Sequence, residues 1–392
     1  MDAVLNATDM LFEQEVREFF EQHWTSELEQ SIADPATMRE GLVKWQNILY
    51  NKGWMAPAWP GEFGGAEWSV TQSYIYNDIR GELGVAERWP AGVLMLGPIL
   101  IRFGTDQQKQ RFLLGILKSE DWWVQGYSEW EAGSDLAALQ CSAVSGGDDY
   151  LITGSKTWVS YAQHANWIFC LVRTDASGPK QQGISFLLIE LDSPGICIKP
   201  IDTIDGFHHL NEVQFENVRV PKANLVGDEG MGWAIAKSLL VEERFVGADI
   251  AGNKRSLKQL KQQAAVELAG GRRLIDDPHF AVQLSELEIS LMALEYSAMR
   301  VLDAAAHGSE PGAESSLLKL QGTEIEQTIQ ELRMDLLAMY AGTDQSTLDR
   351  QTQSHNFAVA AHKQFFRGRA ATIYGGSSEV QKNIIARHAL GI

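Results

Sequence analysis

Cysteine is scarce in this chain, with only Cys141, Cys170 and Cys197 among 392 residues. The number is odd and no CxxC pair occurs, so neither a zinc motif nor a redox dithiol is indicated. Few cysteines without a regular spacing are typical of a reduced, intracellular protein, and we expect a cytoplasmic one. The histidines form no ligand-spaced cluster either, so the sequence implies no metal.

Long apolar runs are also lacking. No stretch of about 18 apolar residues is present, so no transmembrane helix is expected. Residues 1–4 do not form a basic region followed by an apolar run, so we expect no signal peptide. Positive charge is in deficit: the net charge is -18. Such a balance argues against nucleic acid or an anionic membrane surface as the main partner. A local basic cluster can still bind a small anionic substrate.

Hydrophobic periodicity divides the chain into three parts. Residues 12–24 and 107–117 place apolar side chains at helical spacing. The hydrophobic pattern changes near Asp121. From there to about Asp228 it consists of short β-type runs separated by glycine-rich turns. Helical patterns then return. We therefore predict a helical N-terminal domain at 1–121, a small β-barrel-like middle domain at 122–228, and a helical bundle at 229–392.

Two segments of the β region carry residues suited to chemistry. Residues 127–135, Tyr-Ser-Glu-Trp-Glu-Ala-Gly-Ser-Asp, form a turn whose N–H and hydroxyl groups can face a phosphate or a planar ring. Residues 154–160 place Trp158 and Ser160 on one face of an extended segment, which suits a heteroaromatic cofactor. Taken singly, neither segment is specific: a plain turn is the favoured explanation of the first, and a core tryptophan in a strand would explain the second.

The order of the motifs is more specific than any one of them. The serine-rich acidic turn, Lys156-x-Trp158-x-Ser160, the run at 171–175 and Asn-Glu-Val-x-Phe-x-x-Val-Arg-Val-Pro at 211–221 precede a closing Ile-Tyr-Gly-Gly-Ser-Ser-Glu-Val-Gln at 373–381. This series resembles the acyl-CoA dehydrogenase family along most of the chain. The resemblance implies a helical domain, a β domain, a C-terminal four-helix bundle, and FAD bound between the last two and partly against a neighbouring subunit.

The resemblance also assigns residues. The positions that match those meeting FAD are Gln125, Tyr127, Ser128, Ser134, Trp158, Ser160, Ser377 and Glu379. Ser134 also matches a serine near the CoA chain. The family commonly has proline where this chain has Trp130, which changes the rigidity of the turn because proline fixes φ. Arg272 and Arg273 are candidates for an arginine that reaches FAD from another subunit, but the spacing to Phe280 does not match, so neither is assigned.

The resemblance offers two positions for the glutamate that acts as catalytic base. Many family members carry a glutamate between Tyr and Gly of the closing motif, and here that position is Gly375. Other members place the base on a bundle helix just before an arginine, which here is Glu243 before Arg244 in a helix predicted over 233–252. Glu243 falls on an apolar stripe of that helix, where a carboxylate is costly unless paired or functional. Pairing with a basic group is the structural alternative, and we favour Glu243 as the base.

The resemblance then implies the remaining partners. Arg244 matches a substrate-binding arginine, and Gly375 can offer its N–H to the thioester oxygen. We expect an acyl-CoA substrate, electron transfer to an electron-transfer flavoprotein, and a homotetramer or a heterotetramer with a second chain of this family. Residues 53–65 and 211–244 are most similar to bacterial members acting on dicarboxylyl, branched, cyclic or steroid side-chain CoA esters, such as pimeloyl-CoA dehydrogenases. The alternatives are a non-catalytic partner subunit and, disfavoured by Glu243, a flavin oxygenase.

Overall fold

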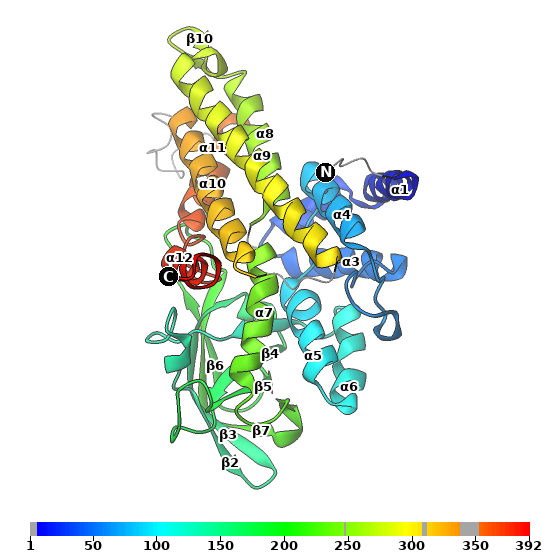
Figure 1. The fold of residues 1–392 in the computed structure, drawn as a ribbon, viewed down its shortest axis with the longest axis vertical. Coiled ribbons are helices and arrows are strands. Elements are labelled where there is room, and N and C mark those ends of the chain that lie inside the picture. The colour runs from blue at the N-terminus through cyan, green and yellow to red at the C-terminus, as the bar shows by residue number, and fades with distance from the viewer. Residues whose placement is uncertain (1–5, 247, 308–311, 338–352) are drawn as a thin grey trace.

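The structure is a computed structural model that describes residues 6–246, 248–307, 312–337 and 353–392. A helical part, a sheet and a helical bundle follow one another along the chain (Figure 1). The helices are α1 (Ala7–His23), α2 (Ser26–Ala33), α3 (Met38–Lys52), α4 (Val70–Leu83), α5 (Gly97–Phe103), α6 (Asp106–Leu117), α7 (Gly232–Val246), α8 (Ile250–Ala264), α9 (Pro278–Ala306), α10 (Glu314–Leu337), α11 (Gln353–Gly368) and α12 (Ser378–Ile385).

The N-terminal helices begin and end where the sequence supplies caps. Asn6 caps α1, with its side chain accepting from the Asp9 backbone N–H. The apolar face predicted for residues 12–24 is buried, with Val16 and Phe20 almost inaccessible to solvent. Gly53 ends α3 in the left-handed conformation that glycine adopts readily. The helical character predicted for this part of the chain is thus confirmed.

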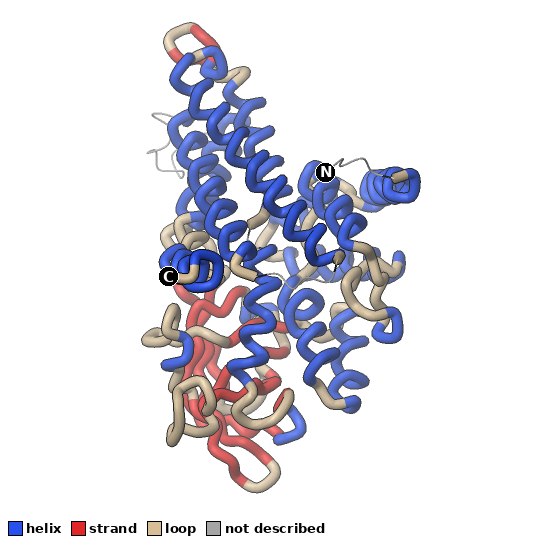
Figure 2. The backbone as a smooth tube through the Cα atoms, in the orientation of Figure 1, coloured by secondary structure: helices blue, strands red, loops and turns tan. Residues whose placement is uncertain are grey.

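Eight strands of the middle region form one sheet (Figure 2). They are β1 (Trp123–Gly126), β2 (Ser142–Gly146), β3 (Asp149–Ser160), β4 (Trp167–Arg173), β5 (Ile184–Glu190), β6 (Ile196–Ile201), β7 (Leu210–Pro221) and β8 (Leu225–Val226). The order is β6-β7-β3-β2-β4-β5-β8, with β1 parallel to β4. Within the described residues no pairing joins β6 to β8, so the sheet is open rather than a closed barrel.

A continuous apolar core joins the three parts of the chain. It includes Trp45 and Leu100 from the N-terminal helices, Phe186 from β5, and Ile235 and Leu239 from α7. A second apolar cluster on the sheet contains Ile168, Cys170 and Val213. Because β4 and β5 bury side chains on both faces, their sequences are mostly apolar, interrupted within β5 by Ser185. Helix α7 contacts both β5 and α10, so it connects the sheet with the bundle.

The bundle is built from α8, α9, α10 and α11, which pack on one another around α10. The predicted helix over 233–252 is wrong in one respect, because it is divided into α7 and α8. Asp249 has a left-handed backbone, with φ of 36°, and its side chain accepts from the Gly252 N–H to cap α8. This cap starts a new helix, so Ile250 does not continue the apolar stripe of α7.

Two small strands, β9 (Leu268–Ala269) and β10 (Arg272–Arg273), form a hairpin between α8 and α9. The hairpin lies at the end of the bundle farthest from the sheet (Figure 1). Among the described residues, no helix is both long and apolar enough to cross a membrane. Nor does that part of the chain bring together three or more His, Cys, Asp or Glu side chains that could hold a metal ion.

The contact between α4 and α8 predicts a packing-sensitive position. A Cβ atom added at Gly81 would lie 2.3 Å from the Ala251 Cβ, so Gly81→Ala must push the two helices apart. Overpacking of this kind costs about 1–3 kcal/mol, and we expect a lower Tm in calorimetry. Gly178→Ala is the matched control, because the nearest atom to its Cβ would be 3.9 Å away. Equal Tm values for both variants would contradict this account of the interface.

Candidate functional site

The turn after β1 is bound directly to β3. The Thr157 N–H donates to the Ser128 carbonyl oxygen at 2.9 Å. The Lys156 ammonium donates to the Tyr127 carbonyl oxygen at 3.2 Å. Gln125 lies in β1 opposite Phe169 of β4. These bonds bring the predicted cofactor residues of the β1 turn next to those of residues 158–160.

A buried ion pair fixes this turn. Lys156 is fully buried, and its Nζ lies 2.7 Å from Glu129 Oε1. The same carboxylate accepts from the backbone N–H groups of Gln140 and Cys141, at 2.7 and 2.9 Å. Glu129 therefore joins three segments and gives the turn a rigidity that does not depend on proline at position 130. Both Glu129 and Lys156 belong to the sequence motifs described above, but their pairing carries no signal in the sequence.

Trp158 departs from the regular strand that the sequence predicted. The pairing of β3 with β7 shifts register between Lys156 and Val159, and Trp158 has a φ of 60°. A tryptophan is rarely found in this backbone region, so the bulge has to be held by its surroundings. In this bulge Thr157 is buried, and the next residue, Trp158, is 48% exposed. Ser160 is exposed as well.

Trp130 lies beside Trp158. Their ring centroids are 5.1 Å apart with an interplanar angle of 67°, an edge-to-face arrangement. Trp130 is itself 55% exposed. Two large indoles in contact, each half open to solvent, form an aromatic surface at the place where the family pattern has a proline. This surface is suited to a planar ligand.

Ser134 lies in an exposed bend at the end of the same turn. Arg173 holds the residues that follow it, donating to the carbonyl oxygens of Ala137 and Leu139 at 2.7 and 3.0 Å. At the other edge, Asn211 is fully buried and donates to the Val159 carbonyl oxygen at 3.2 Å. Both Ser134 and Ser160 are thus exposed residues next to backbone that is firmly held.

The closing segment forms a turn followed by α12. Gly375 and Gly376 have φ values of 63° and 90°, a region that favours glycine. Ser377 caps α12, its hydroxyl accepting from the Val380 N–H at 3.3 Å. Glu379 is exposed, and hydrogen bonds from its own backbone N–H and from Ser377 lower the pKa of its carboxyl. Gly375 therefore presents backbone, and no side chain, at the position where many relatives carry a carboxylate.

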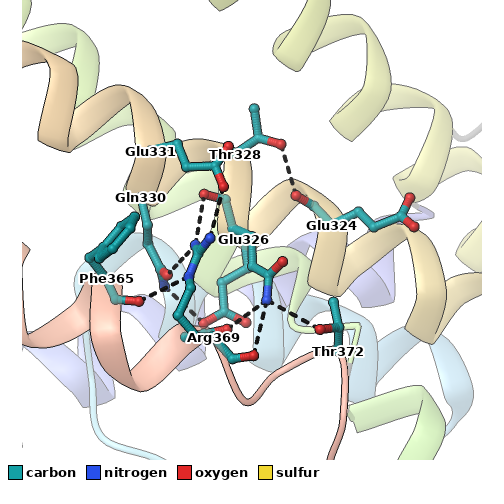
Figure 3. Close-up of polar contacts among 10 residues, drawn as sticks. Glu324, Glu326, Thr328, Gln330, Glu331, Phe365, Arg369 and Thr372 are labelled. Carbon is teal, nitrogen blue, oxygen red and sulfur yellow. Dashed lines mark hydrogen bonds and ion pairs between the residues drawn. The ribbon is translucent and has the colours of Figure 1, made fainter. Parts of the chain in front are cut away.

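Residues just before this turn are tied to α10 (Figure 3). Arg369 pairs with Glu331 at 2.7 Å and donates to the Phe365 carbonyl oxygen at 3.1 Å. Gln327 donates to the Gly368 carbonyl oxygen at 2.9 Å and to Thr372 Oγ1 at 3.3 Å. Arg367, at the end of α11, interacts electrostatically with Asp205 and His209 of the β6–β7 loop.

That last interaction links the end of α11, just before the closing segment, to the β region. The carbonyl oxygen of His209 accepts from the Tyr161 N–H at 2.7 Å, next to Ser160. The residues predicted to bind FAD thus fall on two parts of the fold that approach each other through this loop. Glu243 and Arg244 belong to α7, but their side chains lie outside the described residues. Arg272 and Arg273 lie in the exposed hairpin, where Arg273 pairs with Asp276 at 2.7 Å.

Family models match almost the whole chain. The N-terminal, middle and C-terminal domains of acyl-CoA dehydrogenase match residues 6–120, 125–218 and 230–390. The chain therefore belongs to the acyl-CoA dehydrogenase family, whose members are FAD-dependent oxidoreductases that dehydrogenate acyl-CoA thioesters. The division of the chain at residues 121 and 228 stays a prediction.

The chain is similar in sequence and in structure to individual members of this family. Acyl-CoA dehydrogenase IpdE1 of Mycobacterium tuberculosis is 34% identical over 354 residues, which covers 89% of this chain and 87% of that relative. Among solved structures, the ChsE4-ChsE5 complex of the same organism has a TM-score of 0.86 at 29% identity, covering 100% of this chain and 99% of that one. A steroid acyl-CoA dehydrogenase, Tcur3481-Tcur3483, has a TM-score of 0.84 at 27% identity, covering 100% and 99%.

The residues of this site fit FAD. Half-exposed indoles at Trp130 and Trp158 offer planar contact surface, and exposed hydroxyls at Ser134 and Ser160 offer hydrogen bonds. The buried Thr157 hydroxyl finds no hydrogen-bond partner among the described residues. A buried polar group without a partner is costly, so a ligand that supplies one is favoured there. The individual roles of Gln125, Tyr127, Ser128, Ser134, Trp158, Ser160, Ser377 and Glu379 remain predictions.

The ion pair below this surface yields a stability prediction. Glu129→Ala leaves the Lys156 ammonium buried beside the Tyr127 carbonyl oxygen without its carboxylate. Removing one partner of a buried pair costs about 3–5 kcal/mol, so we expect a clear loss of thermal stability and of FAD content. Asp135→Ala is the control, since it breaks an exposed pair with Lys180 in the same turn and should change Tm little. A similar loss in both variants would refute the special role of the buried pair.

Proposed function

We propose that this chain converts an acyl-CoA thioester to its trans-2-enoyl-CoA, with Glu243 removing the α proton. The observation that carries the proposal is the Gly375–Gly376 turn, which leaves no side-chain base at position 375, where many family members carry a glutamate. A carbon acid of this kind needs a carboxylate with raised basicity and donors for the developing enolate oxygen. FAD, when bound, supplies the acceptor for the hydride from the β carbon.

The path of α7 from the sheet to the bundle supports Glu243 as the catalytic base. The first half of the helix is buried in the shared core, with Ile235 and Leu239 inaccessible or nearly so. After the helix, Ala248 packs on α10, because a Cβ atom added at Gly322 would lie 2.3 Å from the Ala248 carbonyl oxygen. Position 243 therefore belongs to the stretch of helix that runs from the sheet to α10. Burial of a glutamate there would raise its pKa and its basicity.

The closing turn has a complementary part in the proposal. The Gly375 N–H is suited to donate to the thioester oxygen, because a residue without a side chain lets the ligand approach the backbone closely. Such a donor stabilises the negative charge that develops on this oxygen as Glu243 takes the proton. Arg244 would bind the substrate beside the base, and Ser134 would contact its CoA portion. The base and the donor thus come from separate elements.

The partners are an electron-transfer flavoprotein, as acceptor of the electrons, and a second chain of the same family. A structural relative described as a complex, ChsE4-ChsE5, supports hetero-oligomer formation. On α9, exposed apolar residues recur at spacings of seven, three and four, namely Val282, Ile289, Met292 and Tyr296. Such spacing forms one stripe along a helix and suits packing against a partner helix. The alternative, a subunit that only completes another chain's flavin site, is not favoured.

The base assignment has a direct test. Glu243→Gln should retain FAD, because it preserves shape, but should slow anaerobic bleaching of the flavin by acyl-CoA by about 10²–10⁴-fold. Glu242→Gln, one residue earlier on α7, is the matched control and should bleach at close to the rate of the unmodified chain. Rapid bleaching by Glu243→Gln would rule out this assignment.

Substrate class is a second expectation. The steroid acyl-CoA dehydrogenase among the structural relatives leads us to expect a bulky cyclic or steroid side-chain acyl-CoA. A panel of thioesters, compared by kcat/KM, should favour these over straight chains by at least about tenfold, equivalent to ~1.4 kcal/mol. The panel should be run on the chain alone and after coexpression with a related subunit, with native mass spectrometry of both. Highest activity on a short straight chain would contradict the expectation.

A further inference from the structure

A lysine of the bundle is buried against the turn of the closing segment, and the proposed chemistry gives it no role. Lys319, on α10, is 1% exposed. Its ammonium donates to the carbonyl oxygens of Ala371 at 2.9 Å and of Gly376 at 3.0 Å. Burial of an ammonium group is costly unless its charge meets strong acceptors. The backbone of the turn supplies two of them.

The turn is wrapped around this ammonium. Ala371 and Gly376, which accept its hydrogen bonds, are the two ends of the segment that contains Gly375. Between them, the Tyr374 ring centroid lies 6.0 Å from Lys319 Nζ, within reach of a cation–π interaction. The lysine therefore contacts the segment at its beginning, middle and end. A single ammonium group thus joins the two ends of the segment.

A second side chain holds the turn from the other direction. Gln381, on α12, is fully buried and donates to the carbonyl oxygens of Gly375 at 3.2 Å and of Gly376 at 3.1 Å. A Cβ atom added at Gly376 would lie 2.4 Å from Gln381 Nε2, so only glycine leaves room for this approach. The Gly376 carbonyl oxygen thus receives donors from both α10 and α12.

The peptide that matters chemically lies between these anchored groups. The Gly375 N–H belongs to the Tyr374–Gly375 peptide, with the Ala371 anchor before it and the Gly375 and Gly376 carbonyls after it. Both glycines can adopt many backbone conformations, so without anchors the direction of this N–H would vary. A donor to a developing oxyanion is effective when its direction is fixed before the reaction.

We propose that Lys319 is a positioning residue for acyl-CoA dehydrogenation, whose ammonium holds the turn at 371–376 so that the Gly375 N–H keeps one direction. The inference rests on the proposed function, because it assumes that this N–H serves the thioester oxygen. Arg369 (Figure 3) and Gln327 hold the chain before the turn, and Ser377 holds it afterwards. Among these anchors, Lys319 bonds to both ends of the turn itself.

The test compares Lys319→Met with the unmodified holoenzyme. Hydrogen–deuterium exchange should become faster in peptides that cover residues 371–378 and stay unchanged in the sheet. Anaerobic bleaching of FAD by acyl-CoA should slow by up to about 10²-fold, as misplaced groups in an active site do. FAD content and the dissociation constant of the thioester, followed by the flavin spectrum, should change less than threefold.

Two further variants make the result decisive. Lys382→Met removes an exposed lysine of α12 close in sequence to the turn and should behave as the unmodified chain in all readouts. Gln381→Met removes the other anchor and should reproduce faster exchange and slower bleaching, which keeps the test valid if Lys319→Met does not fold. Unchanged exchange in the turn would overturn the proposal, as would faster exchange spread evenly over the bundle.

The experiments distinguish a failure of the proposed function from a failure of the positioning role of Lys319. If the unmodified enzyme does not bleach with any thioester, the proposed function fails, whereas the exchange result still reports whether Lys319 holds the turn. If the unmodified enzyme bleaches and Lys319→Met bleaches at the same rate with a loosened turn, the positioning role is wrong and the proposed function stands.

Discussion

The site depends on lysine ammonium groups that are buried against backbone carbonyl oxygens. Lys156 binds the Tyr127 carbonyl oxygen and Glu129 on the β side, and Lys319 binds the Ala371 and Gly376 carbonyl oxygens on the bundle side. In both places the charge holds a loop that carries residues predicted to belong to the site. Regular secondary structure alone would leave these loops without partners, because their carbonyl oxygens belong to no ladder. Neutral side chains of similar size would fill the space without directing the peptide groups.

Much of the fold could be predicted because periodicity and caps are local properties. Phe12, Val16 and Phe20 mark one face of α1 in the sequence, and Ser377 marks the start of α12. The bulge at Trp158 could not be predicted this way, since it depends on the register with β7 and on bonds from the turn after β1. The division of α7 from α8 depends likewise on the backbone conformation of Asp249, which the apolar stripe does not reveal.

The candidate site, like the fold, could be predicted from the sequence only in part. The closing motif pointed to Gly375, and its left-handed backbone agrees with the choice of glycine there. The Lys319 contacts had no such signal, because a lysine within a helix is ordinarily read as a solvent-exposed residue. The ion pair of Glu129 and Lys156 joins residues 27 positions apart, which no spacing rule connects. Long-range contacts of buried charged groups are therefore the part of the site that only the folded structure reveals.

The apolar core shared by the N-terminal helices, the sheet and α7 has a consequence for how the chain matures. During synthesis, the helices that contain Trp45 and Leu100 emerge well before Phe186, and before Ile235 and Leu239 complete the cluster. Until then their apolar faces lack a permanent cover, so the nascent chain presents binding surface to chaperones. An excised N-terminal part would retain this exposed surface, and cutting the gene at a domain boundary would produce fragments prone to association rather than independent modules.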